Sequence, residues 1–244
     1  MITKKHIQRI EKIFQFSYID VCITTFNRLP YIQKCVWSIL ASSSFPIRIH
    51  VIDDCSTDGT RAWLKEMVER KLIHNVIYNA IKIGTANSLN EVINSSDSNM
   101  FVFANDDMWF HRWWDITALS IFHRFKDCGV VSLYDYTSNK IGINAKWISK
   151  NVISLKVSGL GATMMDRNLW KKSGNFYLPL TAVMGFFASK FCQNLEKVRY
   201  EKNKIYAPIP HYVTHMDRPK CVLNEREYEQ NVGYIQFRRK MKLK

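Results

Sequence analysis

Acidic and amide side chains follow two short apolar runs of the sequence, and their types suit a phosphate ligand bound through a metal ion. They are Asp53, Asp54, Asn105, Asp106 and Asp107. In an α/β sheet, ligands bind outside the carboxyl ends of parallel strands. Oxygen ligands of this kind hold divalent cations together with phosphate groups. The two clusters therefore predict a nucleotide site with a divalent cation, Mn²⁺ or Mg²⁺.

The second cluster contains a predicted pair of metal ligands. In an extended chain, Asn105 and Asp107 point to one side and Asp106 to the other. We therefore expect Asn105 and Asp107 to bind the cation together. Because an amide oxygen is neutral, this pair carries one negative charge fewer than two aspartates would, so either the metal binds more weakly or Asp106 compensates. The structural alternative is a turn whose side chains bond to their own backbone.

The first cluster could read a nucleotide base. A carboxylate facing a planar base can accept a hydrogen bond from a ring N–H, as uracil offers, and Asp53 is the expected contact. The neighbouring strand end offers a hydroxyl, an aromatic wall and a positive charge for phosphate, within the set Thr24, Phe26, Asn27 and Arg28. Alternatively, Asp53 or Asp54 caps the following helix, although Asp58 is closer to that helix.

Strands and helices must alternate to bring these clusters to one edge. Apolar runs predict four strands in the first half, at residues 18–25, 47–52, 72–78 and 100–104. Apolar residues at helical spacing predict a helix in each gap, and the segment 84–90 opens the third of them at Gly84. The short connections favour a parallel sheet with right-handed crossovers. The predicted fold class is therefore α/β.

The second half of the sequence is less regular, and we expect it to bind the group that receives the transferred moiety. It shows helical patterns at 111–125 and 182–198, and strand-like patterns at 129–134, within 159–166 and at 204–213, the last interrupted by prolines. A chain of 244 residues can form one large domain. We divide it into an N-terminal helical extension (1–17), one domain (18–216) and a basic C-terminal helical tail (217–244).

The net charge of +14 predicts attraction to polyanions, anionic lipid or phosphorylated substrates. Much of the basic excess lies in the C-terminal tail, which is either a solvated helix or a patch that contacts an anionic membrane surface. Nucleic acid is not the expected partner, because two acidic clusters at strand ends repel phosphate unless a cation intervenes.

The cysteines and the apolar runs indicate in which cellular compartment we expect the protein. The six cysteines are scattered without the spacing of a zinc or redox motif, which predicts reduced thiols in a reducing compartment. No apolar run approaches the roughly 20 residues that a membrane span needs. We therefore predict a cytoplasmic protein that contacts a membrane at most peripherally.

Four segments, in this order, resemble the nucleotide-binding motifs of the family-2 glycosyltransferases with the GT-A fold: 24–28, 51–60, 84–90 and 105–107. The segments 159–166 and 170–176 are similar to the acceptor-side region of that family, and the likeness covers roughly residues 18–216. The resemblance implies a single GT-A domain. Its central sheet would be Rossmann-like and mostly parallel, with flanking helices and an irregular acceptor-side second half.

The activity implied by the resemblance is inverting, metal-assisted transfer of a sugar from a nucleotide-diphosphate donor, UDP-linked, to a hydroxyl of a glycan, a lipid-linked acceptor or a protein. It also implies that Asn105 and Asp107 stand at the Asp-x-Asp metal motif of the family and that Asn90 lies beside the donor pocket. Of two histidines near the end of the domain, His211 and His215, we favour His215 as a ligand of the metal or the diphosphate. The donor-binding set is then Thr24, Phe26, Asn27, Arg28, Asp53, Asp54, Gly84, Asn90, Asn105 and Asp106.

One departure concerns the general base. The family places an acidic residue after its acceptor-side segment, whereas the matching stretch here, 183–187, has no carboxylate and ends in Phe186 and Phe187. Phenylalanine cannot accept a proton. Asp106, Asp166 or Asp217 could serve instead. The alternative function is a catalytically impaired or non-enzymatic protein that binds polyanions or a membrane surface on the same scaffold.

Overall fold

The computed structural model describes residues 17–134, 145–156, 161–174, 195, 204–209 and 211–216. Predictions for the N-terminal extension, the helix at 182–198 and the C-terminal tail fall on residues outside these ranges, apart from residues 17 and 195. The elements are β1 Ile19–Thr25, α2 Leu29–Ser42, β2 Ile47–Asp53, α3 Thr60–Glu69, β3 Asn75–Tyr78, α4 Thr85–Asn94, β4 Met100–Asn105, β5 Met108–Phe110, α5 Trp114–Arg124, β6 Cys128–Ser132, β7 Ala145–Ser149, β8 Val152–Leu155, β9 Ala162–Asp166, α6 Arg167–Ser173, β10 Lys204–Pro208 and β11 Val213–His215.

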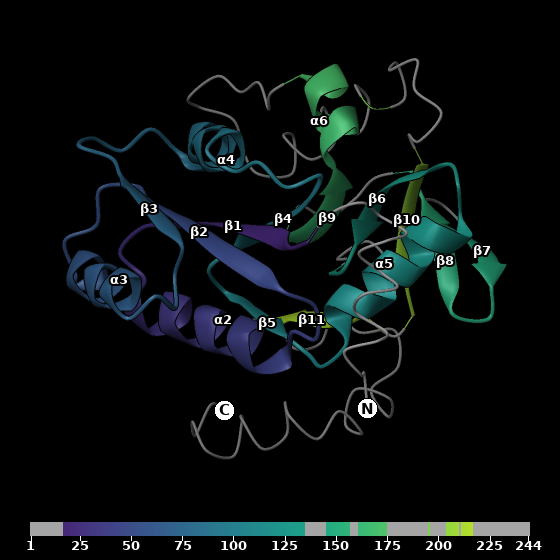
Figure 1. Ribbon diagram of the computed structural model, residues 1–244. Helices are drawn as coiled ribbons and strands as arrows, with labels where there is room; N and C mark the ends of the chain where they lie inside the picture. Colours follow the sequence, from purple (N-terminus) through teal and green to yellow (C-terminus); the bar gives the residue numbers. More distant parts are fainter. Residues whose placement is uncertain are drawn as a thin grey trace.

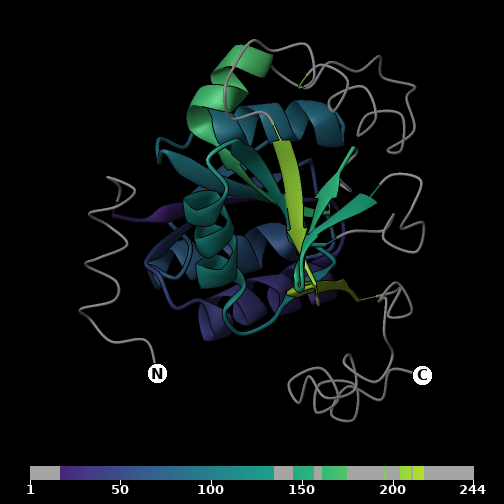
Figure 2. The ribbon, with the colours of Figure 1, turned by 90° about the vertical axis from the view of Figure 1, so that its right-hand side faces the viewer.

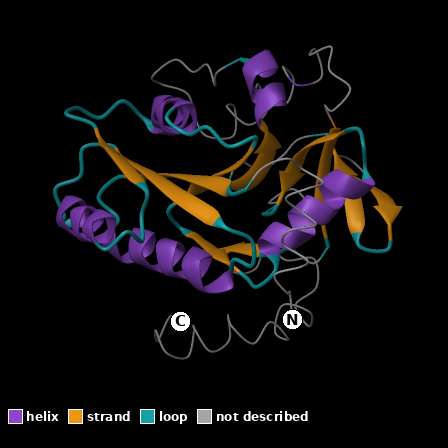
Figure 3. Ribbon diagram, in the orientation of Figure 1, coloured by secondary structure: helices purple, strands orange, loops and turns teal. Residues whose placement is uncertain are grey.

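A nine-stranded sheet runs through the centre of the molecule in the order β3-β2-β1-β4-β9-β6-β10-β8-β7. The four strands of the first half are parallel, as predicted. β8 and β9 run against the direction of the other strands in this sheet. The sheet is therefore mostly parallel and flanked by helices, which confirms the predicted α/β fold class (Figures 1 and 3).

Helices cover both faces of the sheet, and the strands are apolar on both sides because both faces are buried. Ile19, Val21 and Ile23 of β1 face the layer of α2, α3 and α5, whereas Cys22 faces the layer of α4 and α6. Figures 1 and 2 show the two layers on opposite sides of the sheet. Alternate residues of a strand thus enter different clusters, as the period of two requires.

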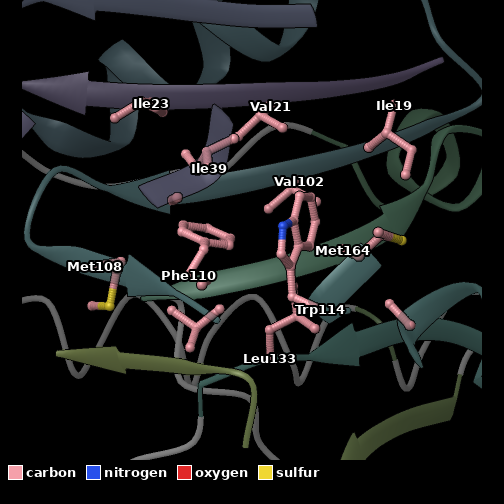
Figure 4. Packing of buried hydrophobic residues seen from close by; sticks show 14 of the residues in the cluster. Ile19, Val21, Ile23, Ile39, Val102, Met108, Phe110, Trp114, Leu133 and Met164 are labelled. Carbon is pink, nitrogen blue, oxygen red and sulfur yellow. The ribbon is translucent and has the colours of Figure 1, made fainter. Parts of the chain in front are cut away.

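The cluster on the α2 and α5 side is centred on two large rings. Trp114, at the start of α5, is fully buried, and its ring packs edge-to-face on Phe110 of β5 with 5.0 Å between centroids. Figure 4 shows both side chains beneath Val21 and Val102 of the sheet. A buried pair of this kind contributes about 1 kcal/mol beyond the area that it buries. The pair fixes β5 against the sheet.

A second, two-stranded sheet was not predicted. β5 pairs antiparallel with β11, and His215 stands opposite Met108. The sequence pattern predicted one interrupted strand over 204–213. Instead, β10 ends at Pro208, which cannot donate a hydrogen bond to a strand ladder, and the chain starts a new strand at Val213. The break lets the chain leave the main sheet for β5.

Two other boundaries differ from the predictions. The third strand begins at Asn75 and not at residue 72, because a turn with Lys71 at φ 57° follows α3 and bonds Leu72 back to Met67. The predicted helix over 111–125 begins at Trp114.

Four cysteines lie in the described part of the chain, and none of these four forms a disulfide: Cys22, Cys35, Cys55 and Cys128. Among the described residues, no helix has both the length and the apolar character that crossing a membrane requires.

The amino edge of the sheet buries a charge that is fully paired. Asp20 in β1 accepts two hydrogen bonds from Arg48, and its Oδ1 lies 3.1 Å from His50 Nε2. Its Oδ2 also accepts the backbone N–H groups of Asp97 and Ser98. Burial alone would raise the pKa of Asp20, but these donors outweigh it and hold the pKa well below the usual range.

We predict that Asp20→Asn lowers the free energy of unfolding by about 3 kcal/mol, because it removes the charge that pairs with Arg48 and replaces one of the two buried acceptor oxygens by an NH₂ group that faces other donors. Since the folded-state pKa is depressed, the stabilisation is present above about pH 4 and is lost as the pH falls further. Urea unfolding at pH 7 and pH 3 measures both effects. The control is Asp97→Asn, which removes an exposed carboxylate that also pairs with Arg48 and should cost less than about 1 kcal/mol. Equal losses in the two variants would contradict the role of Asp20.

Candidate functional site

A cavity of about 470 Å³ opens at the carboxyl edge of β1 and β4. Its walls come from the β1–α2 loop, the β4–β5 turn, the start of α4 and the end of β11. The lining residues are Thr24, Thr25, Phe26, Arg28, Asp54, Lys82, Thr85, Ser88, Asn105, Asp106, Asp107 and His215. Most of the predicted donor and metal residues are therefore at one place.

The β4–β5 turn presents the predicted metal ligands. The backbone N–H of Asn105 bonds to the carbonyl of Gly161 at 2.9 Å, which fixes the end of β4 against the start of β9. The backbone carbonyl of Asp107 accepts the N–H of Met216 at 2.9 Å, directly after β11. The turn is thus held from two sides by segments of the second half.

Positive and hydroxyl groups surround the two carboxylates of this turn. Asp107 Oδ2 lies 2.8 Å from Arg28 Nη1 and 3.3 Å from His215 Nε2. Asp106 Oδ2 accepts the hydroxyl of Thr25 at 2.8 Å, and its Oδ1 lies 3.3 Å from Arg28 Nη1. Two adjacent buried carboxylates are therefore compensated by one guanidinium, one imidazole and one hydroxyl.

These neighbours give the two carboxyl groups different pKa values. Burial raises the pKa of Asp106 to about 7, although Arg28 and Thr25 partly oppose it. Burial also acts on Asp107, but His215 and Arg28 outweigh it and hold its pKa below the usual value. Asp107 is therefore the carboxylate of the pair that is ionised at neutral pH.

Two oxygen atoms in the turn have no partner among the described residues. Asn105 Oδ1 and Asp107 Oδ1 are buried, and neither accepts a hydrogen bond from this part of the chain. A buried acceptor without a partner is rare in folded proteins and often marks a site for an ion or water. These are the two residues that the sequence predicted as a ligand pair. Their chemistry fits a hard divalent cation, although the described residues contain no group of three His, Cys, Asp or Glu side chains that could hold a metal.

The β1–α2 loop is tied to the β2–α3 loop. Asn27, at φ 50°, accepts the N–H of Thr57 at 2.7 Å through its side chain, and its own N–H bonds to Ser56. Asn27 is thus a loop-fixing residue and does not line the cavity. It holds the adjacent Phe26 and Arg28 where they reach the cavity.

The two adjacent aspartates after β2 have different positions. Asp53 is fully buried, and its Oδ2 accepts Arg61 Nε at 2.6 Å and the N–H of Ser56 at 3.0 Å. Asp54 lines the cavity, and its carboxylate accepts the N–H groups of Ile83 and Gly84. The prediction that Asp53 contacts a base stays a prediction, and Asp54 is the one of the pair that faces the cavity.

Asp54 also positions Lys82, a cavity residue that the sequence analysis missed. By binding Ile83 and Gly84, it fixes the loop that carries Lys82 and starts α4. Gly84 adopts φ 83°, a conformation that favours glycine. The Lys82 Nζ lies 3.9 Å from the centroid of the Phe26 ring, so a cation and an aromatic face share one wall. The sequence signal that could have identified Lys82 is its position, two residues before the glycine that opens α4.

Four residues of the cavity were absent from the predicted set: Thr25, Lys82, Thr85 and Ser88. Thr85 and Ser88 are three apart on α4 and so lie on one side of that helix. Asn90, which was predicted beside the donor, lies on another side of α4, in a shallow hollow with Asn87 and Asn94. Asn90 does not line the 470 Å³ cavity, and its predicted place beside the donor stays a prediction.

The structure places Asp166, a predicted general-base candidate, away from the cavity. It pairs with Met100 at the amino edge of the sheet, whereas Ala162 at the other end of β9 pairs with Ala104 near the cavity. Its side chain caps α6 by accepting the N–H groups of Asn168 and Leu169. Asp106 lines the cavity. Asp217, Phe186 and Phe187 lie outside the described residues.

The preference for His215 over His211 agrees with the geometry. His215 lines the cavity and contacts Asp107. His211 is buried, and neither of its ring nitrogens has a hydrogen-bond partner within the described ranges. Burial lowers the pKa of His211 to about 4, so its ring is neutral at pH 7.

Comparisons with known proteins agree with this fold. The TuaG protein of Bacillus subtilis (strain 168), whose name assigns it to glycosyl transfer in teichuronic acid biosynthesis, is 30% identical over 94 residues, which are 37% of this chain and 36% of TuaG. The mannosyltransferase PcManGT of Pyrobaculum calidifontis, solved with GDP-Man and Mn²⁺, superposes with a TM-score of 0.60 at 15% identity, over 85% of this chain and 65% of that one. S. aureus TarS (residues 1–349), solved with UDP-GlcNAc, gives 0.59 at 18% identity, over 82% and 60%.

The two solved structures share the GT-A fold with this chain, which spans less than two thirds of each of these three relatives. Residues 20–192, most of the sequence, match the family described as glycosyl transferase family 2. The chain therefore belongs to glycosyl transferase family 2.

Proposed function

We propose that this chain transfers a sugar from a nucleotide-diphosphate donor, UDP-linked, to an acceptor hydroxyl with the help of a divalent cation. The observation that carries the proposal is the pair of buried, unpartnered oxygens, Asn105 Oδ1 and Asp107 Oδ1, in a cavity that also holds two cationic side chains. The nucleotide sugars bound to PcManGT and TarS support a donor of this class.

The base and the diphosphate would occupy different parts of the cavity. Phe26 and Lys82 form one wall, where the ring can stack on a planar base and the Asp54 carboxylate can accept a ring N–H. Uracil offers one such N–H, and guanine offers more than one, so GDP is the natural comparison ligand. Arg28 supplies a positive charge for the diphosphate.

Asn105, Asp107 and His215 would hold Mn²⁺ or Mg²⁺, with the donor phosphates completing the shell. A bound cation of this kind neutralises negative charge on the departing diphosphate. Mn²⁺ in the PcManGT structure supports this assignment. Asp106 is the general-base candidate that lines the cavity. We propose inversion at the sugar carbon because the family resemblance implies it, and a glycan, lipid-linked or protein hydroxyl as the acceptor.

Calorimetric titration of UDP and GDP, with and without Mn²⁺, tests the donor site. We expect UDP to bind at least tenfold more tightly with 1 mM Mn²⁺ than with EDTA, because the cation bridges the protein and the diphosphate. Asp107→Ala should remove this difference. Glu66→Ala, which removes an exposed carboxylate on α3, should keep it. Metal-independent UDP affinity that depends only on salt would favour a polyanion-binding protein instead.

We predict that Phe26→Leu weakens UDP about tenfold, because stacking of a base on an aromatic ring contributes about 1–3 kcal/mol. Binding of Mn²⁺-pyrophosphate, which has no base, should not change. The same calorimetric titration measures both ligands. A parallel loss for UDP and pyrophosphate would show that Phe26 shapes the whole cavity and does not contact the base.

A further inference from the structure

Arg28 bridges the two buried carboxylates of the β4–β5 turn. Its Nη1 atom lies 2.8 Å from Asp107 Oδ2 and 3.3 Å from Asp106 Oδ1. Both aspartate side chains are less than 10% exposed, so water screens this interaction little. In the absence of a metal, the guanidinium is therefore a major source of positive charge for a pair of carboxylates that would otherwise repel each other.

The guanidinium can move more easily than the carboxylates. Asp107 is fixed by His215 and by the bond between its carbonyl and Met216, and Asp106 is fixed by Thr25. The Arg28 side chain is 35% exposed, and its Cζ lies 4.3 Å from the centroid of the Tyr31 ring. A long side chain that packs on an aromatic ring can exchange one acceptor for another without a change of the backbone.

A divalent cation and this guanidinium compete for the same negative charge. A cation on Asn105 Oδ1 and Asp107 Oδ1 would share the Asp107 carboxylate with Arg28, and like charges at such short range repel each other. A donor diphosphate brings negative oxygens that guanidinium groups bind well. The repulsion between the cation and Arg28 is therefore relieved when the cation and the diphosphate bind together, because Arg28 can then pair with the diphosphate.

We propose that Arg28 is a resident counter-cation, which the divalent cation displaces from Asp107 and which then binds the donor diphosphate. The inference rests on the proposed function and adds a form of regulation to the same site. It makes Arg28 a positioning residue that couples two ligands: the metal alone binds weakly, and the nucleotide raises the metal affinity. By linkage, the metal raises the nucleotide affinity by the same factor.

The test measures Mn²⁺ affinity without activity, by titration followed with Mn²⁺ EPR, in the presence and absence of UDP. For Arg28→Gln, we expect Mn²⁺ without UDP to bind about tenfold more tightly than in the wild type, and the enhancement by UDP to shrink, in the range of usual coupling factors. Lys82→Gln is the matched control, because it removes one positive charge from the same cavity and Lys82 packs on Phe26. Its Mn²⁺ affinity without UDP should change by much less. Arg28→Lys, which keeps a cation, should stay near the wild type.

A thermal-unfolding experiment gives a second readout. In EDTA, Arg28→Gln should melt below the wild type, because the two carboxylates lose their counter-charge. Mn²⁺ alone should then raise the melting temperature of the variant more than that of the wild type, since a tighter ligand stabilises more. Unchanged or weaker Mn²⁺ binding by Arg28→Gln without UDP would overturn the inference. If the wild type binds no Mn²⁺ with UDP present, the proposed function itself fails.

Discussion

Two adjacent carboxylates, Asp106 and Asp107, are buried at the carboxyl edge of the sheet, and their repulsion must be compensated by groups from elsewhere. The compensation comes from Thr25 at the end of β1, from Arg28 in the loop that follows it, and from His215 in β11. No local segment could supply all three. The parallel arrangement of β1 and β4 and the unexpected pairing of β5 with β11 are what bring them within hydrogen-bond distance.

Buried carboxylates at the two edges of the sheet differ in how completely they are hydrogen-bonded. At the amino edge, Asp20 accepts hydrogen bonds from Arg48 and two backbone N–H groups and contacts His50, so both of its oxygens are used. At the carboxyl edge, Asn105 and Asp107 each keep a buried oxygen that accepts no hydrogen bond from the described residues. Unlike the unpartnered nitrogens of His211, these oxygens belong to residues that line the cavity. The described residues therefore satisfy both oxygens of the buried carboxylate at the amino edge, but not those of the two cavity residues at the carboxyl edge.

The sequence predicted what depends on local pattern. Strand runs, helix starts and the polar residues after each strand placed Thr24, Asp54, Asn105 and Asp107 at one edge, because parallel strands all end there. Pairing between distant segments was not predictable in this way. To predict the position of Asp166, one would have to know that β9 runs antiparallel to β4. The residues of a strand do not themselves indicate its direction in the sheet. Asn90 lies on a different side of α4 from Thr85 and Ser88, and this side depends on the exact rotation of the helix against the sheet.

The two-stranded β5–β11 sheet also affects how the molecule folds. His111 bonds to Thr214 across 103 positions of the chain, while β1 and β2 pair across fewer than thirty. Contacts between residues so distant in sequence form late and slowly, because the loop between them must close first. During synthesis, the β1–β4 unit can therefore assemble while β11 is still unmade. In a nascent chain, Asp106 and Asp107 would therefore lack the contact with His215 until β11 pairs with β5.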